Sequence, residues 1–345
     1  MPVLGPVATA VPANRIPQDK LRELARSVLA DTDPRLARIL SVFDNAGIDE
    51  RAFAMPLEWY YGEHGFKDRG EAFLRVGMDL VERATRDALD AARIGPREVD
   101  GVLFVSTTGI ATPSLDARLA NVVGMRPDVV RLPIWGLGCS GGVAGLNRAA
   151  DLARARPDGR FLLVALELCS LAFDMSRLDK KMLVAASLFG DGCAATIVSG
   201  DALGAPGARH LRGASHLFPR TERVMGWDVE DRTLDVVFST EIPEIVARET
   251  AGVVRPFLDG AQPDHWILHP GGTKVLEAYE TSLALPADAL RFSRAALRAH
   301  GNMSSPTVLF ALAGAQSASV PRAGETALIA SVGPGFAMDL ALVTG

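Results

Sequence analysis

Along the chain, short runs that are almost wholly apolar alternate with longer stretches in which apolar residues recur at helical spacing. The runs at Gly101 to Ser106 and Arg160 to Leu168 predict buried strands, and the periodic stretches at Phe73 to Ala92 and Glu244 to Leu258 predict helices. Buried strands joined through helices favour a parallel or mixed sheet covered on both faces. The same patterns predict helices at Gln18 to Ala30, Arg35 to Phe43, Leu115 to Val123, Lys274 to Ser282 and Arg291 to His300, and strands at Cys193 to Ser199, His265 to Leu268, Thr326 to Val332 and Ala337 to Val343.

The composition shifts towards glycine, alanine and proline between Gly200 and Gly213, after which strands and helices alternate again. A chain of 345 residues has room for two core-sized units. We therefore predict an N-terminal half, residues 1–201, and a C-terminal half, residues 202–345. Because both halves share the same alternation, an internal duplication would explain them.

The overall composition is that of a globular protein, with 48% hydrophobic and 22% charged residues. A net charge of -5 without long runs of like charge gives no general attraction for nucleic acids or acidic membranes. The apolar segment Met1 to Pro17 is broken by prolines and lacks a basic leader, so we expect neither a signal peptide nor a membrane span. The three cysteines lack metal-site spacing, which predicts no metal and a reducing cytoplasm.

Cys139 lies at the centre of a glycine-rich stretch between two predicted elements. An apolar strand, Leu132 to Trp135, precedes it, and a helix, Val143 to Arg156, follows it. A thiol at a helix N-terminus faces unpaired N–H groups and the positive end of the helix dipole, which predicts a lowered thiol pKa and a nucleophilic cysteine. The surrounding glycines would let the backbone turn sharply and leave the sulfur uncovered.

Two other motifs overlap the same stretch. The segment Gly136 to Gly141 fits the G-x-G-x-x-G pattern of nicotinamide oxidoreductases, in the expected strand-to-helix context. Gly138 to Gly142 fits the G-x-S-x-G elbow of serine hydrolases, which would make Ser140 the nucleophile. These residues by themselves leave all three interpretations open.

Three places in the second half carry groups that a cysteine nucleophile needs, and each lies at the end of a predicted element. His269 follows the strand at His265 to Leu268, and Asn302 follows a predicted helix. The turn Gly333 to Gly335 can bring backbone close to a ligand.

With these motifs in place, the chain from about Glu58 to its end resembles the type III polyketide synthases, the chalcone and stilbene synthase family of the thiolase superfamily. Ketoacyl-carrier-protein synthases of the third type are the nearest rival, but they carry His-Gln-Ala-Asn where this chain has His269-Pro-Gly-Gly. The matching motifs, in order, are Thr107-Thr-Gly109 with Thr112-Pro-Ser114, Gly136-Leu-Gly-Cys-Ser-Gly-Gly142, Leu188-Phe-Gly-Asp-Gly192, His269-Pro-Gly-Gly272, Gly301-Asn-Met-Ser-Ser305 and Gly333-Pro-Gly335.

The resemblance implies an α/β thiolase-like fold with two similar halves of mixed β-sheet layered with helices, and a homodimer. It implies a synthase that loads an acyl-CoA starter on Cys139 and extends it by decarboxylative condensation with malonyl-CoA, with His269 and Asn302 as the other catalytic residues. The product would be a pyrone or a resorcinol- or phloroglucinol-type ring. CoA thioesters would be substrates, and no cofactor is implied. A thiolase-fold protein that only binds acyl-CoA stays an alternative.

The resemblance also implies a substrate cavity. Phe189 takes the place of an aromatic gate, and Val236 stands where its aromatic partner would be, which predicts a wider passage for a bulky or fatty acyl starter. Arg51, Lys67 and Arg69 are candidates for CoA phosphates or ordinary surface charges. We further expect Asp191 to make turn hydrogen bonds and His300 to be a charge at a helix C-terminus. The remaining implied substrate-binding residues are Thr107, Thr112, Cys169, Ala172, Ser304, Gly333, Pro334 and Gly335.

Overall fold

The computed structural model describes residues 1–30, 40–174 and 180–345. Its centre is one mixed sheet of ten strands, and most positions of the inner strands are buried on both faces, as the apolar runs predicted. A short strand, β2 (Ala8–Ala10), pairs with β8. The other strands follow the order β12 (His265–Leu268), β13 (Thr326–Gly333), β14 (Ala337–Thr344), β9 (Ala208–Leu217), β1 (Val3–Leu4), β8 (Asp191–Ser199), β7 (Arg160–Leu168), β5 (Gly101–Val105) and β6 (Val130–Ile134).

The two ends of this sheet repeat one pattern. In the first half β5 is parallel to β7, which is antiparallel to β8. In the second half β12 is parallel to β13, which is antiparallel to β14. In each half a helix leads into the middle strand, α5 (Gly141–Ala155) before β7 and α10 (Ser305–Ser317) before β13, and both helices share one apolar core. Two similar halves of mixed sheet are therefore present. The division at residues 201 and 202 stays a prediction.

The helix predicted at Phe73 to Ala92 is longer than expected, because α3 covers Phe66–Ala92. The carboxylate of Asp68 accepts a hydrogen bond from the backbone N–H of Gly65 at 3.2 Å and so satisfies one of the free donors at the helix start. The inner face of α3 packs against the sheet and against α4 (Leu115–Val123). A Cβ at Gly77 would lie 2.9 Å from a methyl group of Leu166, so only glycine allows this close approach.

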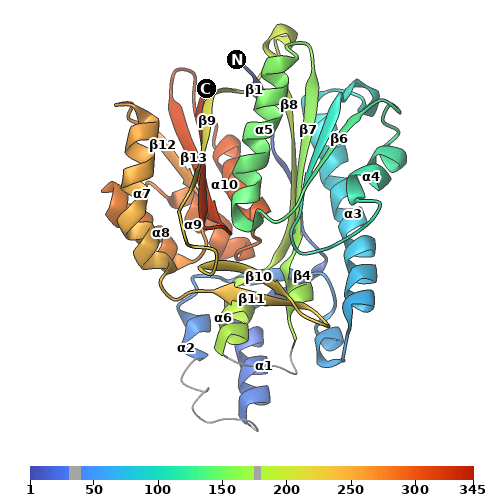
Figure 1. The fold of residues 1–345 in the computed structure, drawn as a ribbon, viewed down its shortest axis with the longest axis vertical. Coiled ribbons are helices and arrows are strands. Elements are labelled where there is room, and N and C mark those ends of the chain that lie inside the picture. The colour runs from blue at the N-terminus through green and yellow to red at the C-terminus, as the bar shows by residue number, and fades with distance from the viewer. Residues whose placement is uncertain (31–39, 175–179) are drawn as a thin grey trace.

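Figure 1 shows the remaining elements around the sheet. The two termini lie close together at the upper end, and α1, α2 and α6 form the lower end. No described helix is long and apolar enough to cross a membrane. The predicted helix at Arg35 to Phe43 begins outside the described residues, and the described part holds α2. The bounds are α1 (Gln18–Ala30), α2 (Ser41–Asp44), α6 (Lys180–Leu188), α7 (Ile242–Leu258), α8 (Thr273–Leu283), α9 (Arg291–His300), β3 (Asn14–Pro17), β4 (Glu50–Phe53), β10 (Met225–Val229) and β11 (Leu234–Phe238).

The sequence patterns missed the short strands β1 to β4 near the N-terminus and the strands β9, β10 and β11. β9 begins at Ala208, so part of the stretch taken as a joint between the halves belongs to the central sheet. Its residues mix polar and apolar side chains without regular alternation, and several positions are exposed, which gives a weaker signal than the buried runs. β10 and β11 form a separate two-stranded hairpin that crosses the lower part of the molecule in Figure 1.

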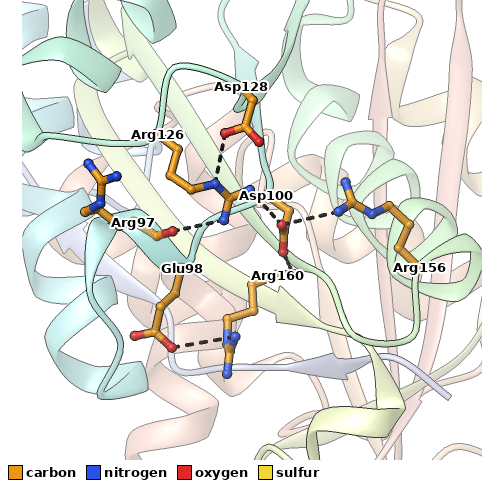
Figure 2. A network of polar contacts seen from close by, with 7 residues as sticks. All are labelled: Arg97, Glu98, Asp100, Arg126, Asp128, Arg156 and Arg160. Carbon is orange, nitrogen blue, oxygen red and sulfur yellow. Dashed lines mark hydrogen bonds and ion pairs between the residues drawn. The ribbon is translucent and has the colours of Figure 1, made fainter.

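Seven charged residues form a network of polar contacts near the beginnings of the parallel strands β5, β6 and β7, and Figure 2 shows them from close by. The Asp100 carboxylate, just before β5, accepts hydrogen bonds from Arg126 at 3.0 Å, Arg156 at 3.3 Å and the backbone N–H of Arg160 at 2.9 Å. These positive neighbours and the backbone donor hold the pKa of Asp100 below its ordinary value, although burial acts the other way. The residues of this Asp100 network are Arg97, Glu98, Asp100, Arg126, Asp128, Arg156 and Arg160.

Candidate active site

Cys139 lies in a short 3-10 turn, Gly138–Ser140, between β6 and the N-terminus of α5. Its side chain is only 5% exposed. The backbone N–H of Gly138 donates to the hydroxyl oxygen of Thr107 at 3.0 Å, which fixes the turn. A Cβ at Gly142 would lie 2.3 Å from the carbonyl oxygen of Ser305, so this glycine lets the first turns of α5 and α10 approach closely. The prediction that this glycine leaves the sulfur uncovered is therefore wrong.

Asn302 reaches the nucleophile from the start of α10. The Cys139 thiol donates to its side-chain oxygen, with sulfur and oxygen 4.0 Å apart. The backbone N–H of Ser304 donates to the same oxygen at 2.8 Å, and the Asn302 amide donates to the carbonyl oxygen of Gly271 at 3.2 Å. The amide nitrogen carries a second hydrogen, so Asn302 keeps a donor for another acceptor.

His269 directly follows β12 and lies in the same turn as Gly271, whose N–H donates to the His269 carbonyl at 3.1 Å. The side chain is 1% exposed, and neither ring nitrogen has a hydrogen-bond partner among the described residues. A buried polar atom without a partner costs free energy and marks a place where a ligand can bind. Asn302 thus contacts both the nucleophile and the turn that carries His269.

Burial controls the charge states of Cys139 and His269, the two candidate catalytic residues that titrate. It raises the pKa of the Cys139 thiol to about 11, although hydrogen bonds with Ser304 and Asn302 act in the opposite direction. It lowers the pKa of His269 to about 3. The predicted lowering of the thiol pKa by the helix N-terminus is therefore wrong, because desolvation outweighs it. At rest the site contains a thiol and a neutral imidazole.

Glu167 is a buried carboxylate that the sequence analysis did not assign to the site. It accepts hydrogen bonds from the backbone N–H of Thr107 at 3.0 Å, from the N–H and hydroxyl of Thr108 at 2.9 and 2.7 Å, and from the Ser305 hydroxyl at 3.1 Å. Burial raises its pKa to about 7. Glu167 thereby ties the loop that holds the Cys139 turn to the start of α10. A single carboxylate at the end of the apolar run 160–168 was the signal for it.

A small cavity of about 20 Å³ adjoins Cys139, with room for about one water molecule. Phe189 packs there against Trp227 and Phe238, with ring centroids 6.1 and 6.3 Å away. The wider passage expected from Val236 is not seen among the described residues, because these two aromatic rings fill the space beside it. Sequence reasoning missed both rings, since only the fold brings the hairpin β10–β11 over the cysteine. The residues that line the cavity are Gly138, Cys139, Phe189, Met225, Gly226, Trp227, Val236, Val237, Phe238, Ser304 and Pro334.

The other implied substrate-binding residues take different places. Gly333 packs behind the nucleophile turn, where a Cβ would lie 2.5 Å from the backbone nitrogen of Ser140, and Gly335 lies against Leu217. Ala172 lines a second cavity, of about 60 Å³, together with Thr108 and Gly109. Cys169 is fully buried in the apolar cluster that contains Phe189 and Val236, and Thr112 is exposed.

Five charged or titratable residues singled out in the sequence differ in their burial and their partners. Arg51 is fully buried and Arg69 donates to the backbone carbonyls of Leu171 and Phe173, so neither is a surface charge free to meet CoA phosphates. Lys67 is exposed and stays a candidate. Asp191 does not stabilise a turn, because it begins β8 and accepts hydrogen bonds from Ser170 and from the backbone of Ala54. His300 lies in the last turn of α9, but burial lowers its pKa to about 4, so it is neutral at pH 7.

Ser140 has surroundings unlike those of a hydrolase nucleophile. Its side chain is 1% exposed, and its hydroxyl donates to the carbonyl oxygen of Leu137 at 3.0 Å. The helix start behind it, which a dinucleotide phosphate would need, is covered by Ser305 of α10. Both alternative motifs therefore lose their structural context. A buried cysteine beside an asparagine amide and a histidine turn is instead a site for covalent acyl transfer.

Comparison with known proteins gives this site its family. Residues 4–202 match the N-terminal domain, and residues 211–345 the C-terminal domain, of chalcone and stilbene synthases. The chain is 39% identical to the 1,3,6,8-tetrahydroxynaphthalene synthase of Streptomyces peucetius subsp. caesius, over 98% of this chain and 91% of the relative. The chain therefore belongs to the chalcone and stilbene synthase family, the type III polyketide synthases, which are CoA-dependent acyltransferases.

The solved structures agree with this placement. The 1,3,6,8-tetrahydroxynaphthalene synthase of Streptomyces coelicolor A3(2) superposes with a TM-score of 0.94 at 32% identity, covering 99% of each chain. A structure of CsyB in complex with CoA-SH superposes with a TM-score of 0.91 at 25% identity, covering 100% of each chain. The fold is thus the expected thiolase-like α/β fold.

Proposed function

We propose that Cys139, His269 and Asn302 carry out decarboxylative condensation of malonyl-CoA units onto an acyl group held on Cys139. The single observation that supports this most is the position of Asn302, whose amide contacts the thiol and the turn of His269 at once. The CoA complex of CsyB supports CoA thioesters as the substrates. A reducing cytoplasm stays the expected compartment.

Loading transfers the starter from CoA to the enzyme. His269, as a neutral imidazole, accepts the thiol proton, and the sulfur of Cys139 attacks the thioester carbon of the acyl-CoA. The bond between that carbon and the CoA sulfur breaks, and CoA leaves with the proton from His269. Because burial keeps both groups neutral at rest, proton transfer accompanies substrate binding and does not precede it.

Extension needs a place for negative charge. When malonyl-CoA loses CO₂, the electrons of the broken carbon–carbon bond form an enolate on the thioester. A ring N–H of His269 and the free amide hydrogen of Asn302 stabilise its oxygen, and neutral donors do so without giving up a proton. The enolate carbon then attacks the acyl carbon held on Cys139. The bond between that carbon and the sulfur breaks, and the sulfur of Cys139 leaves as the thiolate. A carboxylate in place of Asn302 would repel the enolate.

The product follows from how far the chain grows before it closes. The two Streptomyces relatives are 1,3,6,8-tetrahydroxynaphthalene synthases, and for this chain we propose a pyrone or a resorcinol- or phloroglucinol-type ring. The cavity of about 20 Å³ is too small for any such chain as it stands. Growth therefore requires Phe189, Trp227 and Phe238 to move apart, and the size of the starter depends on how far they can.

Two substitutions test the catalytic assignment. We expect Cys139→Ala to abolish chain extension but to keep slow release of CO₂ from malonyl-CoA, because the enolate donors remain. We expect Asn302→Ala to lower both activities by about a hundredfold or more, as removal of a single such donor does. Product mass and CO₂ release measure the two activities. Extension by Asn302→Ala at a rate near that of the wild type would contradict the proposal.

We also propose that two copies of the chain associate along the edge strand β6. Its outer side has no strand neighbour among the described residues, and an unpaired edge favours pairing with another chain. Exposed apolar side chains lie on this strand and directly after it, with Val130 42% and Trp135 55% exposed. A Val130→Lys variant should elute as a monomer in size-exclusion chromatography with light scattering, whereas the wild type elutes as a dimer. A wild-type monomer, or a dimer unaffected by this change, would count against it.

A further inference from the structure

Arg51 is the largest fully buried side chain of the described residues, and the catalytic steps above do not use it. It projects from β4. One terminal nitrogen of its guanidinium donates to the backbone carbonyls of Ala186 at 2.6 Å and Phe189 at 2.8 Å, and the other donates to the side-chain oxygen of Gln18 at 2.8 Å. No described carboxylate forms an ion pair with it, and burial lowers its pKa to about 9, although the charge of Asp191 acts in the opposite direction. A buried cation held mainly by backbone oxygens is costly unless the segment it holds matters.

The carbonyls that Arg51 holds belong to the end of α6 and the residue that follows it. The last carbonyls of a helix have no partner within the helix and carry partial negative charge, so a guanidinium stabilises them. Gln18 donates from its amide nitrogen to the carbonyl of the neighbouring Ser187 at 2.9 Å. Arg51 and Gln18 therefore fix the path of the chain as it leaves α6 and enters Phe189.

The same segment holds the catalytic asparagine. The backbone N–H of Asn302 donates to the carbonyl of Leu188 at 2.9 Å, and the N–H of Gly190 donates to the carbonyl of Asn302 at 3.0 Å. Phe189 and Asn302 thereby face each other across an isolated parallel bridge. Both backbone groups of Asn302 thus depend on residues 188–190. Its side chain also bonds to Ser304 and Gly271, so residues 188–190 set the place of the backbone from which the amide extends.

The aliphatic part of Arg51 also packs against this bridge. Gly301, with φ +70°, precedes Asn302, and a Cβ there would lie 2.6 Å from Cδ of Arg51. A Cβ at Gly190 would lie 3.4 Å from Cβ of Arg51. One side chain therefore contacts the residues on each side of the bridge and holds the carbonyl of the aromatic residue within it.

We propose that Arg51 is a positioning residue that sets the place of the Asn302 amide, through residues 188–190, and of the Phe189 ring beside Cys139. This inference rests on the proposed role of Asn302 in stabilising the enolate. It predicts that loss of Arg51 slows the decarboxylation of malonyl-CoA and leaves the reactivity of the Cys139 thiol nearly unchanged. The turn that carries Cys139 is held by the hydrogen bond from the backbone N–H of Gly138 to the Thr107 hydroxyl and by the start of α5, which Arg51 does not contact. Burial has a larger effect on the thiol pKa than the hydrogen bond with Asn302, so the thiol should keep most of its reactivity when the bridge shifts.

The test measures both steps in Arg51→Met, which keeps most of the volume and removes the charge and the hydrogen bonds. CO₂ release from malonyl-CoA should fall about tenfold to a hundredfold in kcat, because a shift of about 1 Å in a positioned group costs that much. Alkylation of Cys139 by iodoacetamide should stay within about twofold of the wild-type rate. The matched control is Arg212→Met, which also loses a contact to a backbone carbonyl, that of Leu258 at 2.6 Å, away from the site. It should change neither rate.

Two further variants keep the test decisive if Arg51→Met does not fold. Arg51→Lys keeps the cation but cannot reach both carbonyls and Gln18 together, and Gln18→Leu removes one partner of the guanidinium. Each should lower CO₂ release about threefold to tenfold while alkylation is unchanged. A loss of CO₂ release that only follows the folded fraction in each variant, with alkylation faster as unfolding exposes Cys139, would show a merely structural role and overturn the proposal.

The outcome for Asn302→Ala separates the two claims. If that variant loses CO₂ release while every folded variant at positions 51 and 18 keeps it, the role of Arg51 fails and that of Asn302 stands. If Asn302→Ala releases CO₂ at the wild-type rate, the proposed function of Asn302 fails, and the role of Arg51 fails with it.

Discussion

The catalytic centre and the Asp100 network hold carboxylates in opposite ways. Glu167, beside the catalytic centre, is fully buried, its hydrogen bonds come from neutral groups, and its pKa is raised to about 7. Asp100 lies among arginines near the surface (Figure 2), and its pKa is lowered. Desolvation determines the charge state in the first region, and neighbouring cations and donors determine it in the second. Hydrogen bonds alone do not keep a buried acid ionised.

The same contrast explains the charge states of Cys139 and His269, the proposed catalytic pair. Cys139 and His269 share the dry surroundings of Glu167, and burial shifts the pKa of each towards its neutral form. A site of neutral donors excludes water and keeps its hydrogen-bonding groups free for charge that develops during the reaction. The arginines of the Asp100 network have no such task, since their partners are already in place.

The largest effect should come from removing the buried carboxylate. Glu167→Leu leaves the N–H groups of Thr107 and Thr108 and two hydroxyls buried without an acceptor, which should lower the free energy of unfolding by about 3 kcal/mol or more. Urea unfolding followed by circular dichroism measures this. The matched control is Glu98→Gln in the Asp100 network, whose carboxylate is 48% exposed and should cost less than about 0.5 kcal/mol. Similar losses in the two variants would remove the contrast.

The next effect concerns the thiol. With a pKa of about 11, Cys139 should react with iodoacetamide about a hundredfold faster at pH 9 than at pH 7, because the thiolate fraction rises tenfold per pH unit below the pKa. Mass spectrometry of the Cys139 peptide measures the rate. A rate that levels off near neutral pH would show that a thiolate and an imidazolium form without substrate, and that burial does not control this site.

The smallest effect should come from the surface network. Asp100→Asn should cost about 1 kcal/mol at pH 7, as expected for a partly exposed group of ion pairs. Since the pKa of Asp100 is lowered on folding, its contribution is present above the pKa of the unfolded chain, about 4, and is lost as the pH falls through the lower folded value. The difference between variant and wild type should therefore shrink in acid.

Glu167 supplies the reverse pH dependence. Its folded pKa of about 7 exceeds the unfolded value, so the folded chain binds more protons between about pH 4.5 and 7, and this group lowers stability as the pH rises through that range. Unfolding of Glu167→Gln across these pH values should be flatter than that of the wild type. An unchanged slope in this variant, or one altered equally by Asp100→Asn, would contradict the comparison.

Much of the fold could be predicted because burial leaves its pattern in the sequence. The strands β5, β7, β8 and β13 are apolar nearly throughout, and the predicted helices are present where they are described. The strands β10 and β11 were missed because polar residues interrupt them, although they pair with each other. Polar residues also interrupt β9, and its partners β14 and β1 lie far away in the chain. Local pattern cannot register such pairing.

The catalytic candidates were also found from the sequence, since cysteine, histidine and asparagine at element ends are residue types that acyl transfer needs. Their charge states were not, because the effect of a helix N-terminus can be read from local sequence and the depth of burial cannot. Burial could not be predicted for Arg51 and Asp191 either. Arg51 was a candidate surface charge and Asp191 was expected in a turn, and both are fully buried.

The sequence by itself determined the buried apolar strands of the sheet, the residue types that can do the chemistry and the family that the motifs resemble, because these depend on side-chain type and short-range spacing. Only the tertiary structure decided that Asn302 contacts Cys139, that Trp227 and Phe238 narrow the cavity, and that the buried Arg51 bonds to the carbonyl of Phe189. Each of these depends on contacts between residues distant in the chain, and on the water that those contacts exclude.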